Sequence, residues 1–523
     1  MKRWLLLLVL LLGIVTATGC GNHQANTPGS KSPSVFTIAD ATGDWGFPAP
    51  YTHYLRGPGY VRMSLVFDTL VWKDRQGITP ALAHSGDYQE EENAYIFNLR
   101  DDVTFHDGKS LTARDVVFSF QYAAEHPYPW CDTVLIQKAE VLDTYTAKIY
   151  LSEAFAPFIT NIAAVFPILP EHIYQKVTSP EEYMEPPAAI GTGPFKLVDY
   201  NKHQGTYLFV AFKEYYGGSP RVDQLRFIKV NEQVIPAAIR KGEVAAGPVQ
   251  PDLAAELKQD GYTLLQSGHD WNAKLVFNWQ RPPFDNKELR SALAYAINRS
   301  ELVNIVLRGH GVKGNPGLVP PDSSWYSPAG MEYDYDPVKT RQLLEDMGFV
   351  LQNGKWQKKG HPLEFELLIS SRFSRDAELI KNRLEKAGIG VNIRSMEAKT
   401  VDSRVENWNF DCAIIGHGGL GSDPAYLNQM ILGDGFNSAR YDQNPELKAM
   451  IEEQLHIIDQ TERKEVIAQI QRIYASELPA LSLYYTESFW AHDGSADLYY
   501  TPGGIGPGVP IPLNKLSFVS SEP

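Results

Sequence analysis

The chain has 523 residues, of which 43% are hydrophobic and 21% are charged, so it is neither a disordered nor a fibrous protein. Its formal net charge is −14, which argues against a nucleic-acid partner, because proteins of that class present a basic surface. Three cysteines are too few for a disulfide framework or a cysteine-rich zinc site. At roughly 150 residues per domain, the length predicts three or four domains or subdomains.

The first residues predict export from the cytoplasm. Lys2 and Arg3 precede an apolar run, Trp4–Val15, which is shorter than the roughly 20 residues that a membrane-spanning helix needs. A basic start followed by a short apolar run and small residues is typical of a secretory signal.

The end of this segment predicts a lipid anchor. The residues Ala17-Thr18-Gly19-Cys20 resemble the end of a bacterial lipoprotein signal, with Ala17 in place of the usual leucine. We therefore expect residues 1–19 to be a signal peptide and Cys20 to be lipidated, with an ordinary signal and an incidental cysteine as the alternative. Residues 20–34 are rich in Gly, Pro and Ser and should form a flexible tether on the outer side of the membrane.

Helices and strands are predicted to alternate along the rest of the chain. Capping signals precede apolar periodic residues at four points, which are Thr112 with Asp115, Asp285 with Glu288, Asn298 with Glu301, and Asp336 before Pro337. Strand-like runs lie at Tyr95–Leu99, Ala147–Leu151, Leu225–Val230, Leu363–Ile369 and Val391–Met396. The overall class is therefore α/β.

Two features describe the C-terminal half. Residues 361–397 follow a strand, helix, strand pattern with Gly388 after the helix, which predicts a right-handed parallel βαβ unit. Two long helices are expected at about 445–460 and 462–477. The sequence shows no internal repeat and no low-complexity tract beyond the tether.

A search for catalytic and metal-binding motifs finds none. There is no GxSxG elbow, no HExxH and no phosphate-binding or dinucleotide-binding glycine pattern. The 13 histidines are scattered, and His106 beside Asp107 is interpreted as a turn residue. We therefore predict no catalytic residue, no metal site and no cofactor.

Six sequence islands in register carry a family resemblance. The chain resembles the oligopeptide, dipeptide and nickel class of bacterial ABC-transporter solute-binding proteins, called family 5. The islands are Thr79–Gly108 with Leu111–Phe120, then Gly191–Phe195, then Tyr215–Gly218, then Phe277-Asn278 with Pro282–Asp285 and the helix Leu289–Ile297, then Asp336-Pro337 with Leu343-Leu344 and Gly348-Phe349, and last Asn444–Leu447. They cover about residues 65–490.

The resemblance implies a two-lobed periplasmic-binding-protein fold with an extra domain and a ligand cleft between the lobes. By analogy, lobe I combines 35–70, 186–268 and 488–523, the extra domain spans 71–185, and lobe II spans 269–487. Two crossing segments, His269–Asn278 and Tyr484–His492, should form the hinge. The implied protein is a monomer that closes on its solute and then docks on a membrane permease powered by ATPase subunits.

Peptide-binding members place an aspartate four residues before a proline, after a lobe II strand, and it pairs with the ligand's α-amino group. The matching residue here is Leu420, which cannot neutralise an ammonium group. Asp423 is a possible substitute, and its alternative role is a helix cap before Pro424. His417, in the same loop, either contacts ligand or ends the strand.

Nickel-chelate members use a tryptophan and arginines from the extra domain. Trp130 falls at the tryptophan position, but Pro127 stands where one arginine would be, and residues 165–170 contain no arginine. The carboxylate clamp of that subgroup is therefore missing.

Further residues are candidates for the cleft. Trp45, Tyr51, Tyr54 and Arg56 lie in an aromatic, proline-rich segment that follows the first strand, and the alternative is a surface loop packed on its own aromatics. The remaining candidates are Trp271 and Asn278 at the hinge, Trp408, Asn437 and Tyr441.

We expect a receptor for a peptide or peptide-like solute. A nickel or other metal-chelate receptor is the alternative within the family, and a tethered peptide hydrolase using Asp423 and His417 is a remote one. The last alternative is a signalling or chaperone-like receptor that has no permease partner. Cys131 and Cys412 are expected in different domains, so we favour unpaired thiols over a disulfide.

Overall fold

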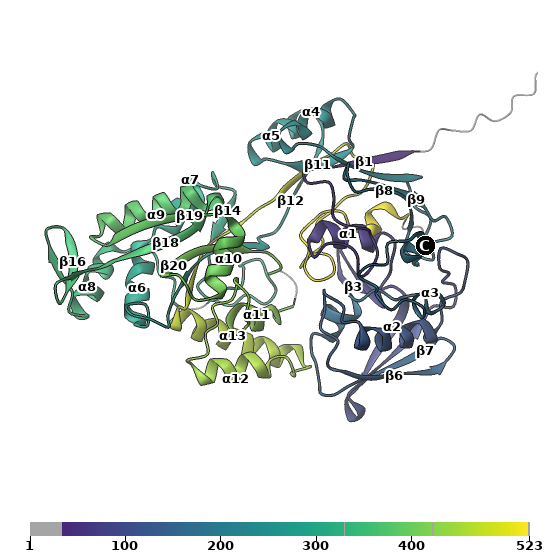
Figure 1. Ribbon diagram of the computed structural model, residues 1–523, viewed down its shortest axis with the longest axis horizontal. Helices are drawn as coiled ribbons and strands as arrows, with labels where there is room; N and C mark the ends of the chain where they lie inside the picture. The colour runs from purple at the N-terminus through teal and green to yellow at the C-terminus, as the bar shows by residue number, and fades with distance from the viewer. Residues whose placement is uncertain (1–33, 329, 421–422, 521–523) are drawn as a thin grey trace, which may run out of the picture.

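The computed structural model describes residues 34–328, 330–420 and 423–520. The predicted signal peptide, Cys20 and the tether up to residue 33 lie outside these residues. Two bodies lie side by side, with purple and yellow segments together in one of them and green segments in the other (Figure 1). Within the described ranges, no helix is both long enough and apolar enough to cross a membrane.

Lobe I is built on a seven-stranded sheet whose strands come from three separate stretches of chain. β1 lies at its centre and pairs in parallel with β10 and β11, burying Phe36 and Ile38. Helices α4 (Ile235–Arg240) and α5 (Pro251–Gln259) pack over the part of the sheet formed by β1, β11 and β22. The strand order is β12 (Thr263–Gln266), β22 (Phe489–His492), β11 (Ala246–Val249), β1 (Val35–Asp40), β10 (Gln224–Lys229), β9 (Thr206–Ala211) and β8 (Phe195–Asn201).

The extra domain shares one apolar core with lobe I. It contains a four-stranded antiparallel sheet covered by α2 (Ala113–Glu125), and a separate hairpin of β2 (Val71–Asp74) and β3 (Gly77–Pro80). The sheet order is β4 (Ala83–Gln89), β5 (Ala94–Leu99), β7 (Thr146–Leu151) and β6 (Ile136–Asp143). Because the core is continuous, we expect the extra domain and lobe I to move as one body.

Lobe II is a six-stranded sheet covered by helices on both faces. The faces bury different cores, with Leu275 in one and Val276 in the other, as expected for alternating side chains on a buried strand. The order is β14 (Gly311–Lys313), β21 (Ala480–Thr486), β13 (Trp271–Phe277), β20 (Cys412–His417), β18 (Glu364–Ser370) and β19 (Gly390–Met396). The helices are α6 (Lys287–Ala296), α7 (Arg299–Ile305), α8 (Pro337–Asp346), α9 (Ser374–Lys386), α10 (Ala398–Glu406), α11 (Tyr426–Ile431), α12 (Pro445–Glu453) and α13 (Gln460–Glu477).

The chain crosses between the lobes twice. One crossing, at residues 267–270, joins β12 to β13, and the other, at residues 487–488, joins β21 to β22. The two crossings are hydrogen bonded to each other, with Ser267 N–H donating to Ser488 O at 2.9 Å and Ser488 N–H to Ser267 Oγ at 2.8 Å. The first crossing therefore lies at the beginning of the predicted hinge segment His269–Asn278, and the second lies in the middle of the predicted segment Tyr484–His492.

Local sequence signals agree with the elements in most places. The capping box at Thr112 and Asp115 is present at the start of α2, and α9 joins the parallel strands β18 and β19 as the βαβ pattern predicts. The predicted cap Asp285 is wrong by one residue, because Asn286 accepts the hydrogen bond from Leu289 N–H. Cys131, in the extra domain, and Cys412, in lobe II, are both unpaired thiols.

Candidate functional site between the lobes

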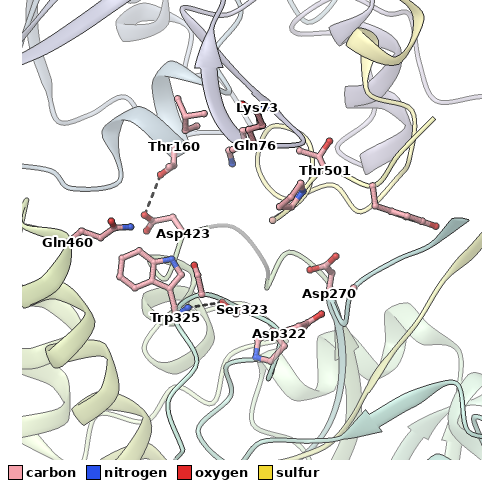
Figure 2. Close-up of a pocket in the computed structure, with 18 of the residues that line it drawn as sticks. Lys73, Gln76, Thr160, Asp270, Asp322, Ser323, Trp325, Asp423, Gln460 and Thr501 are labelled. Carbon is pink, nitrogen blue, oxygen red and sulfur yellow. Dashed lines mark hydrogen bonds between the residues drawn. The ribbon is translucent and has the colours of Figure 1, made fainter. Parts of the chain in front are cut away.

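A cleft of about 730 Å³ lies where lobe I, the extra domain and lobe II meet (Figure 2). The tip of the β2–β3 hairpin forms one wall, because its two strands carry Lys73, Gln76 and Gly77 forward from the extra domain. The opposite walls come from the hinge crossing, the loop after Val319, the start of α13 and the C-terminal loop, which contribute Asp270, Asp322, Trp325, Gln460 and Thr501.

The lobes touch at the rim of this cleft. Thr160, in the extra domain, donates a hydrogen bond to Asp423 of lobe II with an Oγ1–Oδ2 distance of 3.3 Å. The backbone N–H of Ala156 donates to Leu455 O at 2.7 Å, beside the end of α12 that approaches the extra domain in Figure 1. His456 Nδ1 lies 2.8 Å from Ala154 O. These contacts join two bodies that the two crossings also connect.

A buried ion pair organises the lobe II wall. Asp423 accepts two hydrogen bonds from Arg463, at 2.6 and 2.8 Å, and both side chains are almost wholly buried. Arg463 also bonds to Gln454, and its guanidinium carbon lies 5.3 Å from the ring centre of Trp325. The charge of Asp423 is therefore balanced inside lobe II and its position is set by α13.

The hinge side of the cleft is acidic. His269 donates its backbone N–H to Asp322 Oδ2 at 3.0 Å, and its ring Nδ1 lies 3.2 Å from the same atom. Hydrogen bonding to His269 lowers the pKa of Asp322, and the same contact raises the pKa of His269. Burial, together with the nearby charge of Asp322, raises the pKa of Asp270 to about 6.

Lys73 brings a positive charge to the opposite wall. Its ammonium group donates a hydrogen bond to Gly506 O at 2.6 Å. Burial lowers the pKa of Lys73 to about 8, and the charge of Asp423 partly opposes that shift. The cleft thus has both signs of charge, with the negative residues gathered near the hinge.

A second buried lysine lies beneath the loop that follows β20. Lys274, on β13, is fully buried and donates to Asn437 O at 2.5 Å, and burial lowers its pKa to about 7. Burial and the nearby Lys274 also lower the pKa of His417 well below its usual value, so this imidazole is neutral. These groups support the loop from below and do not line the cleft.

Among the predicted binding residues that the structure describes, Asp423 is the one that lines this cleft. Leu420 is fully buried, and His417 is buried on the face of the lobe II sheet that also carries Lys274. Asp423 accepts from Ala425 N–H at 2.8 Å just before α11, which agrees with a role at the start of that helix.

Three of the four N-terminal candidates make hydrogen bonds within lobe I or to the extra domain. Trp45 Nε1 donates to Asp40 at 2.8 Å, Tyr54 OH donates to Asp44 at 2.9 Å, and Tyr51 OH donates to His126 O at 3.0 Å. Two of these bonds stay within the segment or reach the strand before it, whereas the bond from Tyr51 joins the segment to the extra domain. The remaining member, Arg56, is exposed at the start of α1 (Gly57–Ser64), and its charge acts on Asp402 of lobe II.

Trp130 and Trp271 occupy different surroundings. Trp130 donates to His53 Nε2 at 2.7 Å and lines a separate hollow of about 590 Å³ that Gln429 of lobe II also lines. Trp271 stacks on Phe373 in lobe II, with the guanidinium carbon of Arg372 4.0 Å from its ring centre.

Asn278, Trp408 and Tyr441 lie near one another at the end of lobe II away from the hinge, which corrects the hinge position expected for Asn278. Asn278 is buried and donates to the carbonyl groups of Trp408 and Phe410 at 3.1 and 2.8 Å. Tyr441 donates to Glu477 at 2.7 Å and lines a hollow made of lobe II residues only. From Asn272 to Asn278, β13 carries the chain roughly 20 Å from the hinge at about 3.3 Å per residue. Asn437 meets Lys274 through its backbone carbonyl.

The sequence reasoning missed most of the cleft residues. Asp270, Asp322 and Trp325 come from two loops that no motif marks, and Thr501 comes from the C-terminal segment. The signal that was available for Asp270 is its place at a crossing between lobes, because a residue there must lie at the base of the cleft.

Comparison with known proteins agrees with this geometry. Residues 77–439 match the family model described as bacterial extracellular solute-binding proteins, family 5, middle. The chain belongs to this family. The chain is 29% identical over 503 residues to heme-binding protein A of Haemophilus influenzae, covering 88% of each chain, and 28% identical over 449 residues to the dipeptide-binding protein of Escherichia coli, covering 79% of this chain and 82% of that protein.

The solved structures confirm the two-lobed fold of this family 5 protein. The crystal structure of NikZ from Campylobacter jejuni in complex with Ni(L-His) has a TM-score of 0.74 and 23% identity, covering 91% of this chain and 98% of that one. The predicted family and fold class are therefore confirmed, and the family is one of solute-binding proteins acting outside the cytoplasm.

Proposed function

We propose that this family 5 protein captures a peptide or peptide-like solute by lobe closure and delivers it to an ABC permease. The observation that carries the proposal is the cleft of about 730 Å³ lined by both lobes beside a two-strand hinge. Its volume lies within the range of roughly 300–1,000 Å³ that is usual for small-ligand sites. A solute that contacts both walls binds the closed form more tightly and shifts the opening equilibrium toward it.

The lining supports a peptide over a purely apolar solute. Trp325 offers an aromatic wall, while Thr160, Gln76 and Gln460 offer groups that donate and accept hydrogen bonds, as peptide amides require. The glycine and proline residues at 502–503 and 77 bring backbone close to the cavity. The dipeptide-binding relative of Escherichia coli supports the same choice.

The proposal includes an anchored, extracytoplasmic location. The N-terminal residues support a signal peptide at 1–19, lipid on Cys20 and a tether to residue 34. We retain the division into lobe I (35–70, 186–268, 488–523), extra domain (71–185) and lobe II (269–487). The partners would be a permease with its ATPase subunits, and the protein would act as a monomer without catalysis.

No specific observation favours the metal-chelate alternative over the peptide. In the described part of the chain, no three His, Cys, Asp or Glu side chains are grouped to hold a metal ion. The histidine proposed to reach a metal or to act in hydrolysis, His417, is buried below the cleft, and Asp423 is held by Arg463.

Native mass spectrometry of the protein purified from its own host tests the proposal. A heterogeneous set of bound masses that match short peptides is expected. Ser324→Trp, which places a large side chain at an exposed position of the cleft wall, should lose those masses. Ser179→Trp, at an exposed position beyond α3 (Glu171–Tyr174), should keep them. One bound mass with a metal isotope pattern, or equal binding by both variants, would contradict the proposal.

A further inference from the structure

We propose that Asp270 is the residue that pairs with a positively charged amino group of the solute. This inference rests on the proposed function and names the chemistry of one end of the ligand. The group is a primary ammonium, either the α-amine of a peptide or the side chain of a lysine within it.

The position of Asp270 is the first argument. It is the last residue of the crossing at 267–270, directly before β13, and it lines the interlobe cleft. Figure 2 shows its carboxylate directed into the cavity, on the side opposite Asp423. A ligand atom bound there touches the segment that bends when the lobes close, so recognition and closure are coupled at one residue.

The second argument is that the other acids of the cleft already have cationic or donor partners. Asp423 has Arg463 at 2.6 and 2.8 Å, and Asp322 has His269 at 3.0 Å through the backbone N–H. Among the described residues, no backbone or side-chain group donates a hydrogen bond to the carboxylate of Asp270. A half-buried carboxylate without donors is costly unless a partner arrives with the ligand.

The charges that face Asp270 favour a cation as that partner. Asp322 lies close enough to disfavour a second negative charge, and His269 opposes it only in part. Tyr500, from the C-terminal loop, also faces Asp270. Burial and the charge of Asp270 both raise the pKa of the Tyr500 phenol. Burial and Asp322 raise the pKa of Asp270 to about 6. An ammonium group would remove this penalty by supplying both a charge and hydrogen bonds.

The third argument is that the loop after β20 offers no free acid to the cleft, where Leu420 is fully buried. An amino group entering this cleft therefore finds no carboxylate on the loop after β20 except Asp423, which Arg463 neutralises. Asp270 is the remaining negative group within the cleft that can receive it. A metal ion is a poor occupant, because no three acidic, histidine or cysteine side chains of the described chain converge.

The test is a competition measured by native mass spectrometry on the purified protein. The probes are trialanine, N-acetyl-trialanine, Ala-Lys-Ala and N-acetyl-Ala-Lys-Ala, mixed in equal amounts. The expected result is that at least one ammonium-bearing peptide binds about tenfold or more tightly than N-acetyl-trialanine, the value of one charge-assisted hydrogen bond. Comparing trialanine with N-acetyl-Ala-Lys-Ala distinguishes the α-amine from the lysine side chain.

Two variants of equal charge change give the control. Asp270→Asn should reduce the preference to below about threefold, whereas Asp346→Asn, at the exposed end of α8, should keep it. A second measurement needs no variant. With a pKa of about 6, the ionised fraction of Asp270 falls about tenfold between pH 7 and pH 5, and protonation of His269 acts in the same direction, so the wild-type preference should fall by a similar factor.

The outcomes separate the two proposals. If peptides bind without preference for an ammonium group, or if Asp270→Asn keeps the preference, Asp270 is not the binding residue, while the peptide function stands. If no peptide of the mixture binds, the peptide function fails, and the assignment of Asp270 fails with it.

Discussion

Replacing Asp270 by asparagine should make the ligand-free protein more stable at neutral pH. The pKa of this carboxyl is about 6 in the folded protein and about 3.9 in an unfolded chain. Its folded-state pKa is raised, so the folded protein holds a proton that the unfolded chain has lost between pH 4 and pH 6. Stability therefore falls as pH rises through that window.

The size of the effect follows from the shift. About two pKa units at 1.36 kcal/mol each give an upper limit of about 3 kcal/mol above pH 6. Because the side chain is only half-buried, we expect about 1–2 kcal/mol. Asparagine has the same shape and no charge, so it should remove this cost above pH 6 and change little near pH 4.

Urea unfolding of ligand-free wild type and Asp270→Asn, followed by tryptophan fluorescence at pH 7.5 and pH 4.5, measures the difference. Asp346→Asn is the matched control and should differ little from wild type at either pH, because that aspartate is exposed at the end of α8. A variant that is less stable than wild type at pH 7.5, or one stabilised equally at both pH values, would refute the reasoning.

Three further predictions concern the supports of the cleft. Arg463→Met should lower the free energy of unfolding by about 3–5 kcal/mol, because it strands the buried charge of Asp423, and adding Asp423→Leu should recover much of that loss in a double-mutant cycle. Lys274→Met should raise the free energy of unfolding at pH 7.5 by about 1–3 kcal/mol. Burial lowers the pKa of Lys274 to about 7, whereas the same lysine in the unfolded chain stays protonated up to about pH 10. Wild-type stability should therefore rise with pH between about pH 7 and pH 10, and the stability of the variant should not. Gly416→Ala should cost about 1–3 kcal/mol in a thermal melt, because the new Cβ would stand 2.2 Å from the ring of Trp271, and an unchanged melting temperature would contradict this packing.

Local signals in the sequence determined the elements and the family. The capping box at Thr112 and Asp115 works because its hydrogen bonds close within four residues, and the βαβ pattern of 361–397 works because hydrophobic periodicity is set by neighbours along the chain. The six sequence islands indicated family 5, and the two-lobed fold followed from that resemblance.

The tertiary structure decided the residues of the cleft. Asn278 follows the hinge closely in sequence, yet an extended strand carries it to the far end of lobe II. Asp423 has the chemistry of a ligand-binding acid, but its partner Arg463 lies 40 residues further along the chain and is brought to it by α13. No motif marks Asp270 in the sequence. It becomes a candidate binding residue only because the crossing, the loop of Asp322 and the C-terminal loop enclose it. Local hydrogen bonds and periodicity can be read along the chain, whereas the burial and pairing of a charge depend on which distant segments meet around it.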